Sequence, residues 1–244
     1  MRLERYDAPV DLKRTSLPRT AEALALAELR DAIVRGDLPP GAAIRQSAAA
    51  EQLGLSVIPV REALKTLASE GMVSYQPQRG YTVAELRPEG VDGIFRVREL
   101  LEAEAEAVAA ARLRPQDIDA MRAALEAQRE ATASGDAHAA ITANREFHFA
   151  LLERCDNEWL LRFVRQLWDA LEPHRALAYR RTAAKGDRAR AQEILDEHEG
   201  ILAAMEHDDP AAALAVLSAH RAGGLEDFHR LLGPNGTNEA PDAS

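Results

Sequence analysis

Three of the seven histidines in the chain lie among apolar residues that recur at helical spacing. They are His148, His198 and His220, and each belongs to a different predicted helix. Imidazole nitrogens bind zinc, nickel, copper and iron, and the interior of a helical bundle is a common place for such sites. A lone inward-facing histidine is more often a hydrogen-bonded core residue, so the residues alone leave a metal site and coincidence equally open.

A fourth candidate ligand is Asn144, which lies one helical turn before His148 on the same face. Its amide oxygen would complete a set of three nitrogens and one oxygen. The remaining histidines lack such a setting, and we interpret them as structural or surface residues: His138, His174, His207 and His229.

The elements that must position these histidines are about six helices in the second part of the chain. Turn and capping signals separate them, for example Pro115 and the DDP sequence at 208–210. The predicted ranges are roughly 88–112, 116–134, 137–154, 157–182, 188–207 and 210–232. Loops of a few residues join neighbours, which predicts an antiparallel all-α bundle.

The first part of the chain predicts three helices followed by two short strands. Gly36 and Gly54 end the first two helices. The predicted helices lie near 21–35, 46–53 and 56–70, and the strands at 72–75 and 81–84. Two helices across a tight turn, followed by a hairpin with a basic tip, are typical of a winged helix-turn-helix. The expected fold is therefore mainly α, with this unit before the bundle.

The third of these helices has two distinct faces. Its predicted core face comprises Val60, Ala63, Leu64 and Leu67. Arg61 and Lys65 lie on another face, with Val57 one turn before Arg61. Ser56 is the predicted N-cap, and its hydroxyl is expected to accept a hydrogen bond from a free backbone amide. Because arginine can bind guanine through two hydrogen bonds, this face suits the DNA major groove; a solvated basic face is the alternative.

Charge is unevenly distributed along the chain. The net charge is −10, yet residues 1–86 carry 11 basic and 11 acidic side chains, so the acidity belongs to residues 87–244. A neutral first part is compatible with a DNA-binding face.

The cysteine count and the length of the apolar runs indicate the cellular compartment. The single cysteine, Cys155, cannot form an intrachain disulfide, and every apolar run is far shorter than the roughly 20 residues that cross a bilayer. No charged-then-apolar leader is present, so we expect a cytoplasmic protein without membrane contact. The predicted organisation is a flexible arm at 1–19, a winged domain at 20–86, a helical domain at 87–232 and a disordered tail at 233–244.

Three segments of the first domain resemble the GntR family of transcription regulators, FadR branch. They are LRDAIVRGDLPPG at 29–41, LGLSVIPVREALKTLASEGMV at 53–73 and QRGYTV at 78–83. The resemblance implies a winged helix-turn-helix that binds a palindromic DNA operator as a homodimer. The residues it assigns to DNA binding are Arg45, Ser47, Ser56, Val57, Arg61, Lys65, Arg79 and Gly80.

Two of these positions depart from the family pattern. Val57 stands where an arginine is usual, so affinity or sequence preference is expected to differ. Ser47 occupies a position that often contacts phosphate, and Arg45 is expected to compensate for its missing charge.

The segments at 144–160 and 196–221 resemble the FCD effector domain of the same branch, which implies effector binding and dimerisation. The resemblance assigns Asn144, His148, His198 and His220 as metal ligands, with asparagine replacing the usual aspartate. Zinc is the expected ion, and nickel or another transition metal is an alternative. The metal is expected to help hold a small organic acid. Arg98 is the predicted carboxylate-binding residue; the alternative is a surface ion pair with Glu102.

These features support a ligand-responsive transcriptional regulator, expected to act as a repressor rather than as an enzyme. A metal-dependent hydrolase is the alternative, because three histidines with an open position could activate water. No general base is evident beside the histidines, since Glu146 lies on a different face from His148. A purely structural dimerisation module explains neither the wing nor the histidines.

Overall fold

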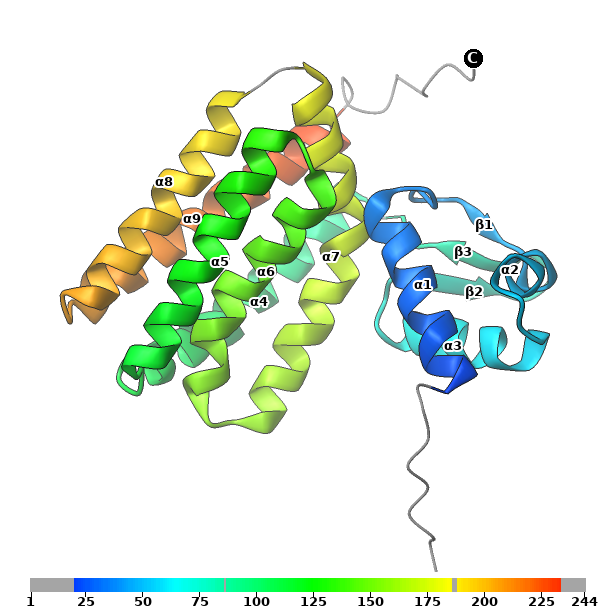
Figure 1. Ribbon diagram of the computed structural model, residues 1–244, viewed down its shortest axis with the longest axis horizontal. Helices are drawn as coiled ribbons and strands as arrows, with labels where there is room; N and C mark the ends of the chain where they lie inside the picture. The colour runs from blue at the N-terminus through cyan, green and yellow to red at the C-terminus, as the bar shows by residue number, and fades with distance from the viewer. Residues whose placement is uncertain (1–19, 86, 186–187, 234–244) are drawn as a thin grey trace, which may run out of the picture.

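The computed structural model describes residues 20–85, 87–185 and 188–233. The arm predicted at 1–19 and nearly all of the tail predicted at 233–244 lie outside the described residues. In Figure 1 a small N-terminal domain with a sheet lies beside a larger bundle of helices. The mainly α prediction is confirmed, with a winged unit followed by an all-α domain.

The N-terminal domain contains the three predicted helices. They are α1 (Ala21–Arg35), α2 (Gln46–Leu53) and α3 (Val57–Ser69). Thr20 caps α1, since its side chain accepts a hydrogen bond from the Ala23 amide at 3.1 Å. Gly36 ends α1 and Gly54 ends α2 in the left-handed conformation, which glycine adopts without steric cost.

The sheet of this domain has one more strand than the sequence predicts. The strands are β1 (Ala43–Ile44), β2 (Val73–Gln76) and β3 (Gly80–Val83), in the antiparallel order β1-β3-β2. The prediction missed β1, because two residues are too short to show an alternating pattern. The β2–β3 turn has positive φ angles at Gln78 (73°) and Gly80 (80°), so the glycine is needed there for conformational reasons.

The second domain contains the six predicted helices, with bounds that differ from the predictions by a few residues. They are α4 (Pro88–Ala110), α5 (Pro115–Ser134), α6 (Ala137–Leu152), α7 (Glu158–Lys185), α8 (Arg188–Glu206) and α9 (Pro210–Leu232), with a short 3-10 turn η1 (Glu153–Cys155) after α6. Their apolar faces meet in a core that includes Phe147, Trp168 and Ile201. Cys155 is buried in the same core, as a structural thiol should be.

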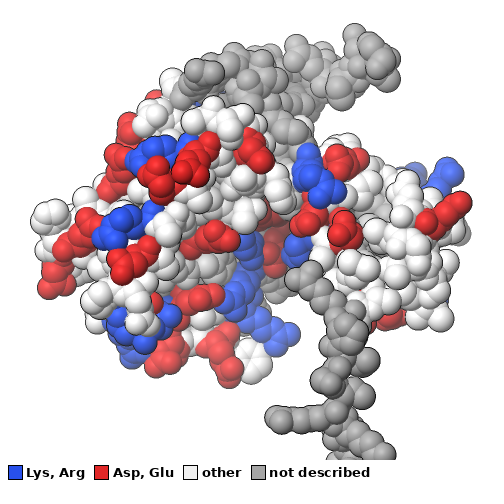
Figure 2. All heavy atoms as spheres, in the orientation of Figure 1, with Lys and Arg blue, Asp and Glu red and all other residues white. Residues whose placement is uncertain are grey.

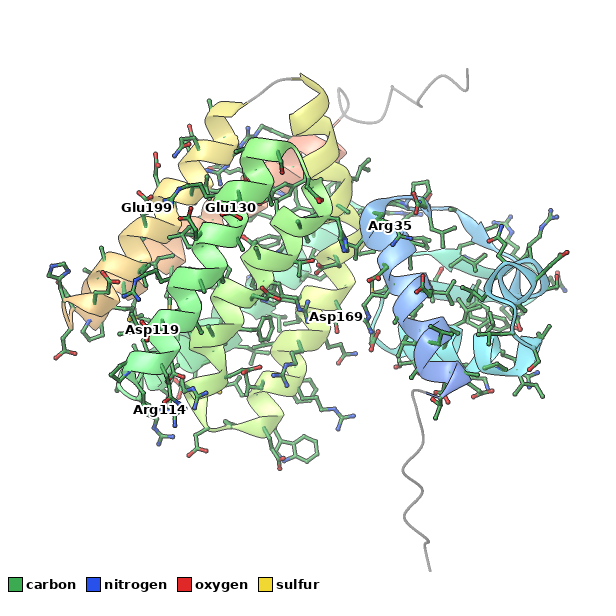
Figure 3. All side chains as sticks on the ribbon, viewed as in Figure 1. Arg35, Arg114, Asp119, Glu130, Asp169 and Glu199 are labelled. Atoms are coloured by element: carbon green, nitrogen blue, oxygen red, sulfur yellow. The ribbon has the colours of Figure 1, made fainter. Side chains whose placement is uncertain are left out.

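The N-terminal domain packs against α6 and α7 of the bundle. Ile141 of α6 and Ala176 of α7 belong to the same buried cluster as Leu29 and Leu64 of the winged domain. Figure 3 labels Asp169 on the part of α7 that faces the winged domain. The two domains therefore share a continuous apolar contact.

Many charged side chains lie on one face of the bundle. Figure 2 shows acidic and basic side chains interspersed over the face of the bundle. In the parts of the chain that the structure describes, no helix is both long and apolar enough to cross a membrane.

Candidate metal centre and nucleic-acid interface

The three histidines that the sequence places on apolar stripes meet inside the bundle. His148 comes from α6, His198 from α8 and His220 from α9. One ligand atom from each lies within 4.8 Å of the others. His198 is 0% exposed, His148 is also buried, and His220 is partly buried. Three separate helices therefore bring their imidazoles to one point.

Two of these imidazoles are held in place through their Nδ1 atoms. His198 Nδ1 lies 2.8 Å from the side-chain oxygen of Gln128 on α5, and His220 Nδ1 lies 2.6 Å from Oε2 of Glu197 on α8. Each acceptor favours the tautomer with a proton on Nδ1, which leaves Nε2 free to act as a ligand. Hydrogen-bonded orientation of this kind is usual for metal-binding histidines.

The spacing and protonation of the cluster fit a transition-metal ion. The Nε2 atoms of His148 and His198 are 3.2 Å apart. Two nitrogens bound to one tetrahedral zinc would be separated by about 3.3 Å. Burial, followed by the neighbouring imidazoles, holds the pKa of His148 and of His198 well below its usual value, so both are neutral as ligands must be.

Asn144, the predicted oxygen ligand, lies one turn before His148 on α6 and is buried. Its position on the helix agrees with the predicted set. Its amide oxygen as the fourth metal ligand stays a prediction.

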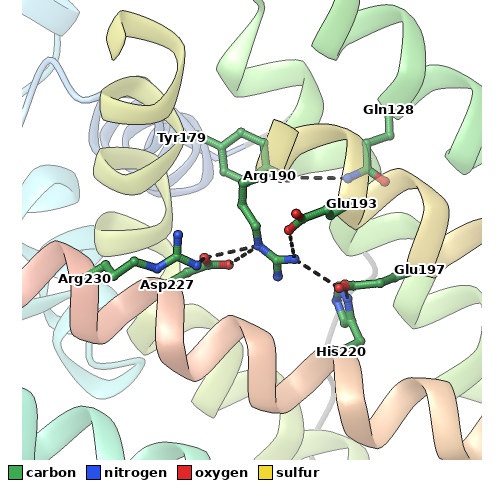
Figure 4. A network of polar contacts seen from close by, with 8 residues as sticks. All are labelled: Gln128, Tyr179, Arg190, Glu193, Glu197, His220, Asp227 and Arg230. Carbon is green, nitrogen blue, oxygen red and sulfur yellow. Dashed lines mark hydrogen bonds and ion pairs between the residues drawn. The ribbon is translucent and has the colours of Figure 1, made fainter. Parts of the chain in front are cut away.

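The carboxylate that orients His220 belongs to a wider network between α8 and α9. Arg190 donates to Glu197 at 3.0 Å and to Asp227 at 2.9 Å (Figure 4). Asp227 lies on α9, two turns beyond His220. Arg190 therefore links Glu197, which contacts His220, to Asp227 on α9, the helix that also carries His220.

Arg98, the predicted effector residue, has an internal partner. Its Nε and Nη2 atoms donate to the two carboxylate oxygens of Glu102 at 2.6 and 3.1 Å. The side chains are 5% and 2% exposed, so the alternative of a pair with Glu102 is present, but it is buried rather than on the surface. Trp168 Nε1 donates to the same carboxylate at 2.8 Å. A buried arginine requires such compensation.

The predicted groove-reading helix α3 has the two faces that its sequence indicates. Val60, Ala63, Leu64 and Leu67 are all buried. Arg61 and Lys65 are exposed, and Glu62 lies between them. Lys65 Nζ is 2.9 Å from the Glu62 carboxylate, and Arg61 Nε is 3.7 Å from it. Glu62 thus partly neutralises the two cations that are predicted to contact DNA.

The start of α3 differs from the prediction in one respect. Ser56 is the N-cap residue with extended backbone, but the expected capping hydrogen bond from its hydroxyl is wrong, since its side chain makes no such bond. The first amides of α3 are therefore left for solvent or a bound anion. Val57 and Ile58 beside them are 43% and 64% exposed, which is high for residues of this size.

The other predicted DNA-binding residues lie on the surface of the same domain. Arg45 is the N-cap of α2, Ser47 lies in its first turn, and both are exposed. Arg79 is exposed in the β2–β3 turn, next to Gly80. Their contact with DNA stays a prediction.

Three residues that sequence reasoning missed shape these sites: Glu62, Gln128 and Glu197. Glu62 could have been found from its place three residues before Lys65, because residues three or four apart share a helix face. Glu197 directly precedes His198 and so points away from it; it meets His220 only because α9 packs on α8. No sequence pattern around Gln128 indicates that it contacts His198.

Together, the winged domain and the helical domain with its histidine cluster define a DNA-binding regulator of two parts. Residues 22–83 match the family model described as bacterial regulatory proteins, gntR family, and residues 93–223 match the FCD domain. The chain therefore belongs to the GntR family and carries an FCD domain, as predicted.

Similar proteins agree with this assignment. The chain is 35% identical to the HTH-type transcriptional regulator McbR of Escherichia coli, over 75% of this chain and 80% of that one. It is 31% identical to a probable D-xylose utilization operon transcriptional repressor of Paenarthrobacter nicotinovorans, over 87% and 91%. The structure titled E. coli McbR/YncC superposes with a TM-score of 0.75 at 29% identity, covering 86% of this chain and 98% of that chain.

The comparisons decide between the functional alternatives. The matched families and relatives are transcriptional regulators, so the chain is a regulator and not an enzyme, and the hydrolase alternative has no support.

Proposed function

We propose that this protein is a ligand-responsive repressor that binds a palindromic operator as a homodimer in the cytoplasm. A divalent metal, zinc by preference, is bound by His148, His198 and His220 with Asn144 as a fourth ligand. The metal holds a small organic acid inside the helical domain. The observation that carries this proposal is that α7 contacts both the histidine cluster and the winged domain.

The contacts of α7 support coupling between the two domains. The Trp168 ring centre lies 5.2 Å from that of His148. The next residue, Asp169, accepts from Arg145 of α6 at 2.8 Å and lies 3.9 Å from Arg30 of α1. A change in the position of α7 on effector binding would therefore alter the seating of the winged domain, and with it the fit to two operator half-sites.

A second set of contacts runs from the histidine cluster to the same boundary. The side-chain oxygen of Gln128 accepts from His198 Nδ1, and its side-chain nitrogen donates to the Tyr179 hydroxyl at 3.4 Å. Tyr179, on α7, packs against the apolar cluster of the winged domain. If Gln128 reorients when His198 binds an ion, its hydrogen bond to Tyr179 would change as well.

Repression and dimerisation have separate support. The relatives include proteins named as repressors, among them the xylose operon protein and GlaR of Escherichia coli. Large apolar side chains of α4 and α7 are exposed, which suits a contact with a second copy of the chain: Val97, Leu100, Trp159 and Phe163. A homodimer would match the symmetry of a palindromic operator.

The test is selection of duplexes from a random library by the purified full-length protein, followed by binding measurements at matched salt. We expect a two-fold symmetric consensus bound at least about a thousandfold more tightly than random duplex. Equal affinity for the selected and random duplexes would contradict the regulator proposal. Elemental analysis of the same preparation is expected to show about one metal atom per chain.

A further inference from the structure

Besides Arg98 on α4, an arginine of α7 lies close to the histidine cluster. The guanidinium carbon of Arg175 is 4.3 Å from the centre of the Trp168 ring, in cation–π contact. Trp168 is the residue whose ring also approaches His148. The Trp168 ring therefore contacts both the Arg175 guanidinium and a candidate metal ligand.

Arg175 differs from its neighbouring arginines in its partners. Arg98 is bound by both oxygens of Glu102, and Arg145 contacts Asp169 and Glu172. Within the described part of the chain, no carboxylate forms an ion pair or hydrogen bond with the Arg175 guanidinium. Arg175 is thus the cation near the cluster whose hydrogen-bonding capacity remains available.

The surroundings of Arg175 favour an incoming anion. Burial, followed by the positive charge of Arg98, lowers the pKa of Arg175 to about 10, while Glu172 and Tyr179 act in the opposite direction. The side chain is still charged at neutral pH. A carboxylate that reached it would supply the compensation that Glu102 supplies to Arg98, and a planar guanidinium can bind both oxygens of such a group.

We propose that Arg175 is the anion-binding residue of the helical domain, and that it binds the carboxylate of a small organic acid held beside the histidine cluster. This inference rests on the proposed function. It assigns to Arg98 a positioning role instead, because the Arg98–Glu102 pair holds the indole of Trp168 through the Glu102 carboxylate.

The test uses the fluorescence of Trp168 in the full-length Trp159→Phe protein, which removes the other tryptophan. Zinc-loaded protein is titrated with acetate, succinate and citrate, with chloride at matched ionic strength as the reference. We expect at least one carboxylate to produce a saturable change that chloride does not. Arg175→Gln should weaken that binding by at least about tenfold, as expected for loss of a charge-assisted pair.

Matched variants separate this role from a structural one. Arg162→Gln removes an arginine of α7 that lies over the Trp159 ring and should leave carboxylate binding unchanged. Arg175→Lys keeps the charge but loses the planar fork, so it should bind about tenfold more weakly while remaining folded. If Arg175→Gln fails to fold, the lysine variant carries the comparison.

Two results would overturn the inference. One is wild-type carboxylate affinity in the Arg175 variants, and the other is the absence of carboxylate binding above the chloride reference in the parent protein. Zinc content and operator binding without acid are measured on the same samples. Normal values for both would show that the Arg175 assignment has failed while the proposed regulator stands.

Discussion

The Oε2 atom of Glu197 lies 2.6 Å from Nδ1 of His220, so a carboxylate on one helix orients a histidine on the next. Arg190 holds the other oxygen of the same carboxylate at 3.0 Å. An anionic acceptor fixes the tautomer of the imidazole and makes its Nε2 a stronger ligand. The metal affinity of the candidate site should therefore depend on how α8 packs on α9, because this packing brings Glu197 to His220.

Replacing this carboxylate tests the connection. We expect Glu197→Gln to weaken zinc binding by about 10- to 100-fold, because the amide accepts the Nδ1 proton without a negative charge. Competition with a chelating dye measures the affinity. Glu193→Gln is the control, since Glu193 contacts Arg190 but no histidine of the cluster. A His148→Ala, His198→Ala double variant should lose the metal altogether, and unchanged metal content in it would exclude the site.

Arg61 and Arg79 are expected to make different contributions to DNA binding. Arg61→Ala should reduce affinity for the selected operator by about 1–3 kcal/mol and relax its sequence preference, because arginine reads guanine in the groove. Arg79→Ala should weaken binding to all sequences alike and reduce the salt dependence. Titrations of operator and random duplex at several salt concentrations distinguish the two, and identical profiles for the variants would contradict the assignment.

Glu62 is expected to limit DNA affinity. Its carboxylate holds Lys65 at 2.9 Å on the exposed face of α3, and the hydrogen bond from Lys65 lowers the pKa of Glu62, so this residue is ionised near any bound phosphate. Glu62→Gln should therefore tighten binding several-fold at low salt and less at high salt. Glu51→Gln, on exposed α2, is the control. Weaker binding by Glu62→Gln would show that Glu62 orders the cations for DNA instead of opposing it.

Asp169 is expected to hold the winged domain against the bundle. Asp169→Asn weakens the contacts with Arg145 and Arg30, which lie on different domains. The connection between β3 and α4 should then be cut several-fold faster in limited proteolysis, because local opening exposes it more often. Glu153→Gln removes an exposed ion pair with Arg165 inside the bundle and serves as the control. Equal cleavage rates would assign the docking to the apolar contact alone.

His174 is expected to make the stability of the protein fall in mild acid. It is 1% exposed, and burial lowers its pKa from 6.5 to about 4. Between these values the unfolded chain binds more protons than the folded one, so stability is lost as the pH falls below 6.5. The loss from this residue is about 2 kcal/mol at pH 5.

Urea unfolding of wild type and His174→Gln at pH 7 and pH 5, both with chelator, measures this effect. The wild type should lose about 2 kcal/mol more than the variant between the two values. The histidine cluster is present in both proteins, so its contribution to the pH dependence of the unfolding free energy cancels in the difference. The same pH dependence in both would show that His174 does not stay neutral.

Much of the fold follows from local residue patterns. Glycine and proline mark where helices end and begin, and the bundle has the six helices that these signals predict. The alignment of His148, His198 and His220 with apolar neighbours also made their inward direction predictable, since an apolar stripe faces a core. The strand β1 was missed because its two residues contain no pattern of their own.

Local patterns are therefore enough to predict the order of the elements, their buried faces and the residue types available for DNA and metal. Which side chains meet depends on how the helices pack. Glu102 neutralises Arg98, Gln128 and Glu197 orient two histidines, and Arg175 keeps no carboxylate partner among the described residues. The physical reason is that hydrogen bonds and ion pairs act over a few ångströms, and helices far apart in sequence reach that distance only when their apolar faces pack.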